Sequence, residues 1–331
     1  MKHNPWTSKS VLIHLFLVIC FLFHFNFLNA QDQDYGQKID AEYTELIREA
    51  TTKPEFLSPL VGTLPQAEGI PTPKDVLGYI AGAPGKLTYY DDIVKYMNSL
   101  ADVSPCVQVI SMGETTEGRE MILVLVTSAK NMKKLSQNKQ LMARLADPRM
   151  VGGEAEADAL ISQIIPSYLL TCNLHSSESG SAEASMEMAY RLAVDDRPIV
   201  KTIRENLVVL IMPSGEPDGH DKHTDWFYKY NQDIKDYSKV SSVPYWGKYD
   251  YHDNNRDMIT MSQPEMQNVA RIYYEWLPVV VQDVPHAVAC HRAIAFLHLA
   301  HRPFQRLCRL LGLGNHRREQ VRDIVVDGEL Q

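Results

Sequence analysis

Residues 168–178 read YLLTCNLHSSE, an apolar run that ends in a group of polar side chains. The apolar part, Tyr168–Thr171, is predicted to form a short strand, and further apolar strands are predicted at Leu207–Met212 and Pro278–Val284. A helical pattern at Ala182–Ala193 follows the first strand. Strands that are apolar throughout and alternate with helices are typical of a mostly parallel sheet buried on both faces, so the pattern predicts an α/β fold.

The sequence on either side of these strands adds a helix, a hairpin and a loop. Apolar residues at helical spacing predict a helix at Tyr90–Ala101. Two β-rich runs joined by a glycine-containing turn predict a hairpin of Cys106–Met112 and Met121–Val126. Pro213–Met261 is predicted to be a long loop. The sequence Ser262-Gln263-Pro264-Glu265 then predicts a helix start, with Ser262 as the capping residue.

Polar residues with metal-binding chemistry follow two of the predicted strands. Ligands of open α/β sheets bind beyond the carboxyl ends of the strands, where His175 and Glu178 follow the first strand and His286 follows the last. An imidazole and a carboxylate three residues apart can reach one zinc ion, and a third histidine leaves a position open for water. With 12 histidines in the chain, one His-x-x-Glu match can also arise by chance. In that alternative, the histidine is a solvated residue of a loop. Ligands after two strands favour a metal site.

A second polar motif, DNNRD at residues 253–257, lies in the predicted loop. The guanidinium of Arg256 together with the amide of Asn255 can hold a carboxylate through a planar fork of donors. The alternative is a surface salt bridge from Arg256 to Asp253 or Asp257, which would contribute little.

Together these features resemble the zinc carboxypeptidase family, the carboxypeptidase A-like metallopeptidases. Asn173–Glu178 resembles its first zinc motif, Glu216–Gly219 its Asn-Pro-Asp-Gly turn, Asn255-Arg256 its pair that holds a substrate carboxylate, and Thr116–Arg119 part of its early hairpin. The resemblance covers about residues 73–284. It implies a three-layer α/β/α sandwich around a mixed, mostly parallel sheet that is incomplete at the C-terminus.

The resemblance also implies roles for single residues. His175, Glu178 and His286 would hold Zn²⁺, with His291 as the alternative third ligand. The metal would lower the pKa of a water and polarise the scissile carbonyl. Asn255 and Arg256 would bind the terminal or a nearby carboxylate of a peptide. A glutamate of a late strand would act as general base, and an arginine would stabilise the oxyanion.

The chain departs from the family pattern in the region that should supply this arginine. No arginine lies between His220 and Asn254. Lys222 or Lys229 is the available substitute, although an ammonium does not reproduce the planar fork of a guanidinium. The third histidine normally follows an Asp-x pair directly, whereas here a proline stands between Asp283-Val284 and His286.

The sequence after Val284 departs further. The family places its general-base glutamate well beyond the third histidine, and the glutamates that follow here are Glu319 and Glu329, neither in a recognisable strand. The tail is rich in arginine, and its alternative interpretation is a basic amphipathic helix near Phe304–Leu313. We interpret the chain as truncated or frameshifted after about residue 284, so the general base is not identified.

The N-terminal sequence predicts export. Residues 1–30 have the charged, apolar and small-residue order of a secretory signal peptide, with a membrane anchor as the alternative. Residues 31–72 form a polar, proline-rich segment with at most a short helix near Ala41–Ala50, and 73–331 form the carboxypeptidase-like domain with an atypical tail at 285–331. We therefore expect a secreted or periplasmic protein without stable membrane insertion after cleavage.

Composition narrows the choice of partner. A net charge of -8 disfavours nucleic acid, which binds basic surfaces, and an apolar fraction of 45% is that of an ordinary globular core. The sequence predicts a secreted, zinc-dependent metallocarboxypeptidase-like hydrolase that acts on peptides or proteins. The alternatives are a non-catalytic peptide-binding relic of the same fold and a related zinc deacylase.

Overall fold

The computed structural model describes residues 36–58, 60–231 and 253–284. The chain divides into two compact units, residues 1–37 and residues 38–331. Only Gly36 and Gln37 of the first unit are described, so the fold below is that of the second unit.

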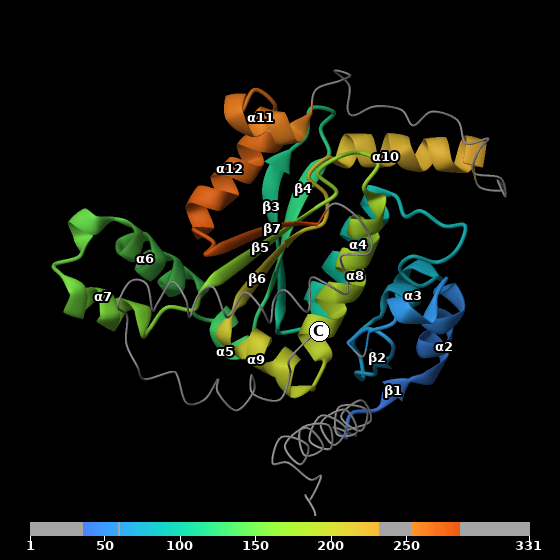
Figure 1. Ribbon diagram of the computed structural model, residues 1–331, viewed down its shortest axis with the longest axis horizontal. Coiled ribbons are helices and arrows are strands. Elements are labelled where there is room, and N and C mark those ends of the chain that lie inside the picture. The colour runs from blue at the N-terminus through green and yellow to red at the C-terminus, as the bar shows by residue number, and fades with distance from the viewer. Residues whose placement is uncertain (1–35, 59, 232–252, 285–331) are drawn as a thin grey trace, which may run out of the picture. The chain divides into compact units, whose positions relative to one another are not determined.

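A five-stranded mixed sheet forms the centre of the described residues (Figure 1). The strands lie in the order β3-β4-β6-β5-β7, with bounds Val107–Glu114, Glu120–Val126, Val208–Met212, Ser167–Cys172 and Val280–Val284. β5 pairs in parallel with both β6 and β7, whereas β4 pairs antiparallel with β3 and with β6. Within this sheet only β4 therefore runs against the other strands, and the prediction of a mixed, mostly parallel sheet is confirmed.

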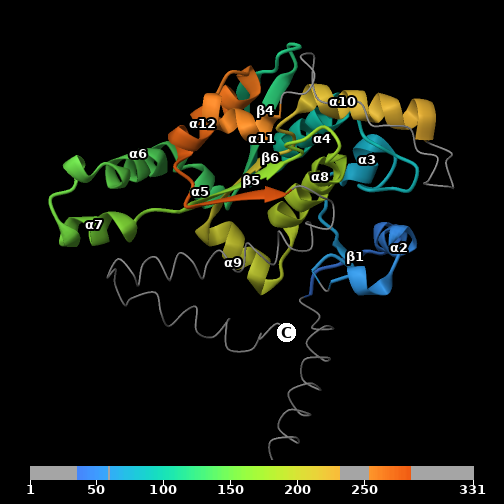
Figure 2. The ribbon, with the colours of Figure 1, turned by 45° about the horizontal axis from the view of Figure 1, so that its top comes forward.

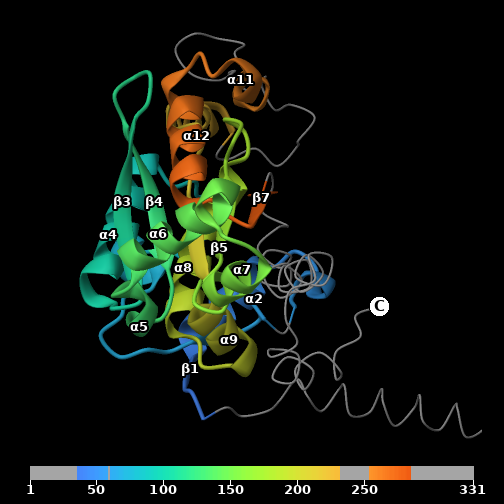
Figure 3. The same ribbon diagram turned by 90° about the vertical axis from the view of Figure 1, so that its left-hand side faces the viewer.

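Helices cover both faces of the sheet, as the burial pattern requires. Every residue of β5 and β6 is buried, because apolar side chains alternate between two separate cores. One core joins the sheet to α4, α8 and α9, which span Tyr90–Val103, Ser179–Val194 and Pro198–Asn206. The other joins it to α12, Pro264–Trp276, and to α6, Leu135–Ala146. The predicted three-layer α/β/α sandwich is confirmed, and Figure 3 shows the β3–β4 hairpin and β7 at opposite edges of the sheet.

The segment ahead of α4 is fastened to the body of the fold. It contains β1 at Ile39–Asp40, α2 at Ala41–Ala50, a 3₁₀ turn at Pro54–Phe56, β2 at Leu64–Pro65 and α3 at Pro73–Leu77. Arg191 of α8, which is fully buried, donates to the backbone carbonyls of Leu60, Val61 and Thr63 at 3.2, 3.0 and 2.6 Å. The predicted short helix near Ala41–Ala50 is confirmed.

Smaller elements complete the described chain. They are α5 at Ala129–Met132, a 3₁₀ turn at Pro148–Met150 and α7 at Glu154–Ile161. In the part of the chain that the structure describes, none of the helices combines the length and apolar character needed to cross a bilayer.

Two sequence predictions are wrong. The predicted loop Pro213–Met261 contains helix α10 at Pro217–Trp226, one π-helical turn at Phe227–Asn231, and helix α11 at Asn254–Thr260. The predicted Ser262 cap is wrong: Gln263 stands at the N-cap of α12 without a side-chain bond, and the Ser262 hydroxyl donates to Asp257.

Candidate functional site

The turn after β5 is fixed by hydrogen bonds from its own polar residues. Asn173 adopts a left-handed conformation, with φ of 47°, in which its side-chain amide donates to the carbonyl of His175 at 2.8 Å. The backbone N–H of Asn173 donates to Ser181 Oγ, also at 2.8 Å. Asparagine tolerates this backbone region better than most residues. The turn therefore delivers His175 and Glu178 at the point where β5 ends and α8 begins.

His175 and Glu178 point toward one another. Nδ1 of His175 lies 2.6 Å from Glu178 Oε1, and the His175 backbone N–H donates to Glu178 Oε2 at 3.0 Å. Glu178 is 7% exposed and the His175 side chain 20% exposed. The predicted metal-binding pair is therefore preorganised, partly shielded, and open to solvent on the histidine side.

Helix α11 brings a second carboxylate to the same histidine. Asp253 Oδ1 lies 3.3 Å from His175 Nε2. Asp253 is also the N-cap of α11, where it accepts the backbone N–H of Asn255 at 2.9 Å, and its other oxygen pairs with Arg256. One aspartate thus joins the predicted metal-binding residues to the predicted carboxylate-binding residues.

Asn255 and Arg256 are exposed, with the Arg256 side chain 74% exposed. The surface salt bridge that the sequence allowed as the alternative is present between Arg256 and Asp253. Because the aspartate in this pair also contacts His175, the salt bridge and a site role are compatible. Asp257 does not pair with Arg256 in this structure and instead accepts from Thr260 Oγ1 at 2.7 Å and from the backbone of Gln263 at 2.9 Å.

Strand β7 lies beside β5 (Figure 2) and contributes Asp283 to the surroundings of the pair. Thr171 of β5 donates its hydroxyl to Asp283 at 3.2 Å, across the parallel register that places these residues side by side. Burial raises the pKa of Asp283, and the nearby charge of Glu178 raises it further, while His175 lowers it. Asp283 therefore lies within electrostatic reach of both predicted ligands. His286 and His291 lie outside the described residues.

The loop after β6 packs against the same turn. The backbone N–H of Gly215 donates to the carbonyl of Cys172 at 2.9 Å. Gly219 lies so close to Ser176 that a Cβ at this glycine would stand 2.6 Å from Ser176 Cβ. No side chain fits there, so the glycine lets α10 approach the turn that carries His175 and Glu178.

Glu216, Asp218 and Glu265 form a buried acidic group beside this loop, each offering one oxygen within 4.8 Å of the others. Each has donors of its own. Asp218 accepts from Thr115 Oγ1 at 2.7 Å and Glu265 from the backbone of Thr116 at 2.7 Å. Burial, followed by the charge of Glu265, raises the pKa of Glu216 to about 7. Such a group can hold a cation, and in this structure its carboxylates also accept hydrogen bonds from protein donors.

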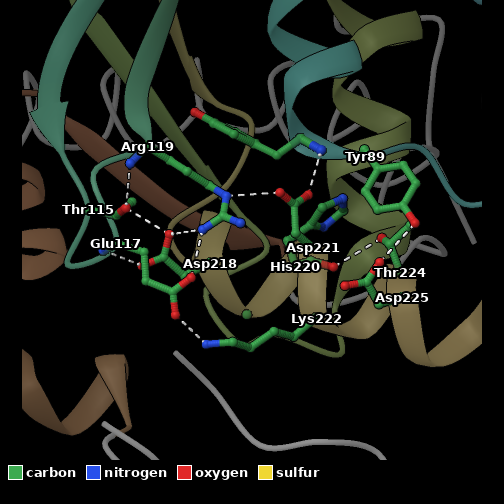
Figure 4. Close-up of polar contacts among 12 residues, drawn as sticks. Tyr89, Thr115, Glu117, Arg119, Asp218, His220, Asp221, Lys222, Thr224 and Asp225 are labelled. Carbon is green, nitrogen blue, oxygen red and sulfur yellow. Dashed lines mark hydrogen bonds and ion pairs between the residues drawn. The ribbon is translucent and has the colours of Figure 1, made fainter. Parts of the chain in front are cut away.

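Arg119 ties the β3–β4 hairpin to α10 (Figure 4). Its guanidinium donates to Asp218 at 2.8 Å, to Asp221 at 2.9 Å and to Glu117 at 2.9 Å. Lys222 pairs with Glu117 on the outside of this network. One proposed substitute for the missing arginine is therefore engaged with the hairpin, and the other, Lys229, lies over the ring of Tyr230 at 5.0 Å.

The surroundings of His175 suit a metal ion. Glu178 and Asp253 face the two nitrogens of its imidazole, and a neutral ring offers one lone pair to a metal and one N–H to a carboxylate. A metal on the Glu178 side, with Asp253 fixing the ring from the other side, satisfies both contacts. A carboxylate behind a ligating histidine is the usual support of a zinc site. The donor set of His175 and Glu178 therefore fits zinc.

Two carboxylates near His175 are not predicted from the sequence as part of the candidate site. The sequence assigns Asp253 only to a salt bridge with Arg256, and Asp283 only to a position before His286. The sequence feature that points to Asp253 is its place in the DNNRD motif, two residues before Asn255 of the candidate Asn255-Arg256 pair. Its contact with His175 joins residues 78 positions apart in the chain, and no local pattern reports such a contact.

The sequence matches the family model described as zinc carboxypeptidase over residues 93–275, which is more than half of the chain. Among curated proteins, none matches the sequence significantly.

Several solved structures are similar to the chain. A putative carboxypeptidase from Burkholderia mallei is 14% identical, with 60% of this chain and 39% of that chain covered and a TM-score of 0.38. Carboxypeptidase A from Helicoverpa armigera is 16% identical, with 61% and 46% covered and a TM-score of 0.37. Thrombin activatable fibrinolysis inhibitor is 12% identical, with 74% and 53% covered and a TM-score of 0.38. The chain matches less than half the length of the first two proteins.

Proposed function

The chain belongs to the zinc carboxypeptidase family, and from this premise we propose that it is a secreted metallocarboxypeptidase-like hydrolase that cleaves peptide bonds. The observation that carries the proposal is the double contact of Asp253, which reaches His175 on one side and Arg256 on the other. A peptidase that recognises a chain end needs its metal ligands and its carboxylate-binding group at a fixed separation, and Asp253 supplies that link.

In this proposal zinc is held by His175, Glu178 and His286, with His291 as the competing third ligand. The position of Asp283, within electrostatic reach of Glu178 and three residues before His286, supports the choice of His286. When bound, zinc supplies Lewis-acid polarisation of the scissile carbonyl and a more acidic water. Asp253 holds the His175 ring in place and favours the tautomer in which Nδ1 serves as a ligand.

Substrate recognition in this proposal falls to Asn255 and Arg256. Both are exposed, as groups that meet a substrate must be, and Arg256 pairs with Asp253, which contacts His175. A peptide carboxylate would bind Arg256 together with Asp253, or would displace Asp253 from Arg256. A guanidinium can bind one carboxylate through two parallel N–H donors. Asn255 would add an amide donor to the same carboxylate. The substrate is therefore a peptide or protein with a free carboxylate near the bond to be cleaved.

The second candidate function is a non-catalytic peptide-binding protein that keeps the metal. It is favoured by one observation. In the sequence, the glutamates that follow Val284 are Glu319 and Glu329, and neither lies in a recognisable strand, so the general base is not identified. Binding without hydrolysis would then be the outcome of the experiment below.

Export of the protein is part of the proposal and rests on residues 1–30, which have the order of a signal peptide. N-terminal sequencing of the protein recovered from both the cells and the medium of an expression host tests it. A mature chain that starts near Gln31 supports export, and a retained Met1 argues for an anchor or for no export.

The activity test uses the full chain, one zinc equivalent, and a pair of peptides that differ only in a free or amidated C-terminus, analysed by mass spectrometry. We expect loss of C-terminal residues from the free acid alone, abolished by His175→Ala. Comparing His286→Ala with His291→Ala identifies the third ligand. Binding of the free acid without cleavage supports the relic, and absence of both binding and cleavage rejects the proposal.

A further inference from the structure

Helix α8 carries a stripe of charged side chains that is buried. Glu183, Glu187 and Arg191 are spaced four residues apart, so they lie along one side of the helix. Glu183 is 3% exposed, the Glu187 side chain is 12% exposed, and the Arg191 side chain is not exposed at all. Charged side chains are almost never buried unless they are paired. The partners of this stripe must therefore lie over it.

Residues 38–84, which we call the N-terminal arm, supply partners for the stripe, and β2 of this arm lies next to α8 (Figure 1). Within the stripe, Arg191 pairs with Glu187 at 2.7 Å. The other oxygen of Glu187 accepts the hydroxyl of Tyr43 at 3.3 Å. The terminal nitrogens of the Arg191 guanidinium donate to three backbone carbonyls of the arm, those of Leu60, Val61 and Thr63. The arm thus completes the hydrogen bonding of a buried cation.

Glu183 holds the chain where the arm ends. Its Oε2 accepts the backbone N–H of Gly82 at 3.3 Å, and its Oε1 accepts the backbone N–H of Thr88 at 2.6 Å. Pro84 and Gly85, which lie between these two contacts, are exposed. A Cβ at Gly85 would meet nothing within 4 Å. One buried carboxylate therefore binds the chain on both sides of an exposed turn.

The arm also contributes to the apolar core that joins α8 to the sheet. Tyr43, Leu64 and Ile80 are 1%, 0% and 4% exposed. They belong to the same cluster as Met186 of α8 and Leu170 of β5. Because these residues of the arm are buried as deeply as those of the sheet, loss of the arm would expose the core of the fold together with the charged stripe.

The contacts of the arm run along α8 away from the candidate metal site. The helix starts at Ser179, directly after Glu178. At a rise of about 1.5 Å per residue, Glu183 lies about 7–8 Å and Arg191 about 20 Å along the helix axis from Glu178. The arm therefore supports the helix behind the turn that carries the predicted metal ligands.

From this arrangement we propose that the N-terminal arm is a permanent part of the folded protein, which the stripe of α8 and the shared core retain even when the chain is cut behind the arm. A segment ahead of a hydrolase domain can instead be one that proteolysis removes, and the exposed turn around Pro84 and Gly85 is the place for such a cut. Here a cut at this turn leaves two pieces that stay together, and the protein works with its arm in place. The inference uses none of the candidate site residues, so its outcome is independent of the proposed function.

The test inserts the recognition sequence of a site-specific protease between Pro84 and Gly85 of the full chain. The cut protein is analysed by size-exclusion chromatography in rising urea, with circular dichroism as the measure of folding and the uncut form as the control for the insertion. We expect the two pieces to elute together until the body of the fold unfolds. An arm that leaves a body which stays folded would overturn the proposal.

A pair of variants of the cut protein tests the stripe itself. Arg191→Met removes the guanidinium that binds the arm, and Arg149→Met is the matched control, because Arg149 pairs with Asp147 on the surface and its side chain is 88% exposed. Isotope-labelled and unlabelled cut proteins are mixed, and native mass spectrometry follows the exchange of arms between them. Arg191→Met should speed this exchange at least about tenfold, the effect of one lost hydrogen bond to a charged group. The control should exchange as the unsubstituted protein does, and equal rates in all three proteins would overturn the proposal.

Hydrogen exchange of the unaltered full chain tests the same proposal without any substitution or cut. The backbone N–H of Leu64 donates to Thr44 Oγ1 at 3.0 Å inside the arm, and it is compared with the amides of β6 at urea concentrations below the unfolding transition. A permanent arm opens only when the whole fold opens, so both sets of amides should report the same free energy of opening. Exchange of Leu64 through an earlier opening, while β6 stays protected, would show an arm that can leave the folded body.

Discussion

Helices α11 and α12 are neighbours in the chain, but they are held in different ways. α12 buries an apolar face against the sheet, formed by Met266, Val269, Ile272 and Trp276. α11 buries only Asn254 and Asp257, through hydrogen bonds to the loop after β6 and to the turn before α12. Apolar burial is non-directional and stabilises the whole fold, whereas hydrogen bonds fix direction and depend on protonation. The candidate binding residues lie on the helix held by the second kind of contact.

The largest effect on the free energy of unfolding is expected from truncation of Trp276 in the apolar face of α12. Trp276→Ala removes a side chain that is 4% exposed, and such substitutions lower the free energy of unfolding by about 3–5 kcal/mol. Ile259→Ala on α11, at a residue that is 87% exposed, should change it by less than about 0.5 kcal/mol. Urea denaturation measures both. Equal losses in the two variants would show that α11 also has an apolar anchor.

A pH effect on stability should come next. The pKa of Glu216 is raised from 4.5 to about 7 in the folded protein, so between these values the folded state binds more protons than the unfolded state. Stability then falls as pH rises through this window and is level above it. Glu216→Gln cannot lose a proton, so relative to wild type it should gain about 1–3 kcal/mol between about pH 4.5 and pH 8. Parallel stability curves for the two proteins would contradict the assignment.

Substitution of Asp253, the carboxylate that contacts His175, should have a smaller effect, which is confined to the affinity for zinc. Asp253→Asn weakens the contact that orients His175 and should reduce zinc affinity about 10–100-fold. Competition with a chromophoric chelator measures the affinity. The zinc-free protein should keep its stability to within about 1 kcal/mol, because Asp253 is a partly exposed cap whose replacement, asparagine, also caps helices. Unchanged zinc affinity would separate Asp253 from the metal site.

The smallest effect on stability is expected at Arg256. Its salt bridge with Asp253 is on the surface, with the arginine side chain 74% exposed, and such pairs contribute less than about 1 kcal/mol. Arg256→Ala should therefore leave the unfolding midpoint nearly unchanged. It should weaken the binding of N-acetylphenylalanine, which has a free carboxylate, but not the binding of N-acetylphenylalaninamide. A lower unfolding midpoint, together with an equal loss of affinity for both compounds, would make Arg256 a structural residue.

The sheet and the helices against it could be predicted because their sequences carry a local signal. β5 and β6 are apolar runs of strand length, and α4 and α8 repeat apolar residues at helical spacing, so the predicted segments overlap the observed ones. The same signal places His175 and Glu178 at a strand end. Apolar patterning was sufficient wherever apolar burial holds the element.

The helices held by polar contacts could not be predicted in this way. α10 has the sequence PDGHDKHTDW and α11 NNRDMIT, and neither presents an apolar stripe. The N-cap of α10 is Glu216, which is not among the strongly preferred capping residues. Asp218 and Asp221 accept from Arg119 of the hairpin, which lies 99 and 102 residues away in the chain. The predicted Ser262 cap is wrong because α12 has Gln263 at its N-cap, and the hydroxyl of Ser262 donates to Asp257. Such contacts are long-range and leave no periodic trace in the sequence.

The most direct test of the account is X-ray absorption spectroscopy of the full chain loaded with one equivalent of zinc, in wild type and in His175→Ala. The account predicts a zinc environment of mixed nitrogen and oxygen ligands with imidazole scattering, at distances of about 2.0–2.2 Å, and a weaker imidazole contribution in the variant. An all-oxygen environment that is identical in both proteins would contradict it. Such a result would place the ion in the acidic group of Glu216, Asp218 and Glu265 instead.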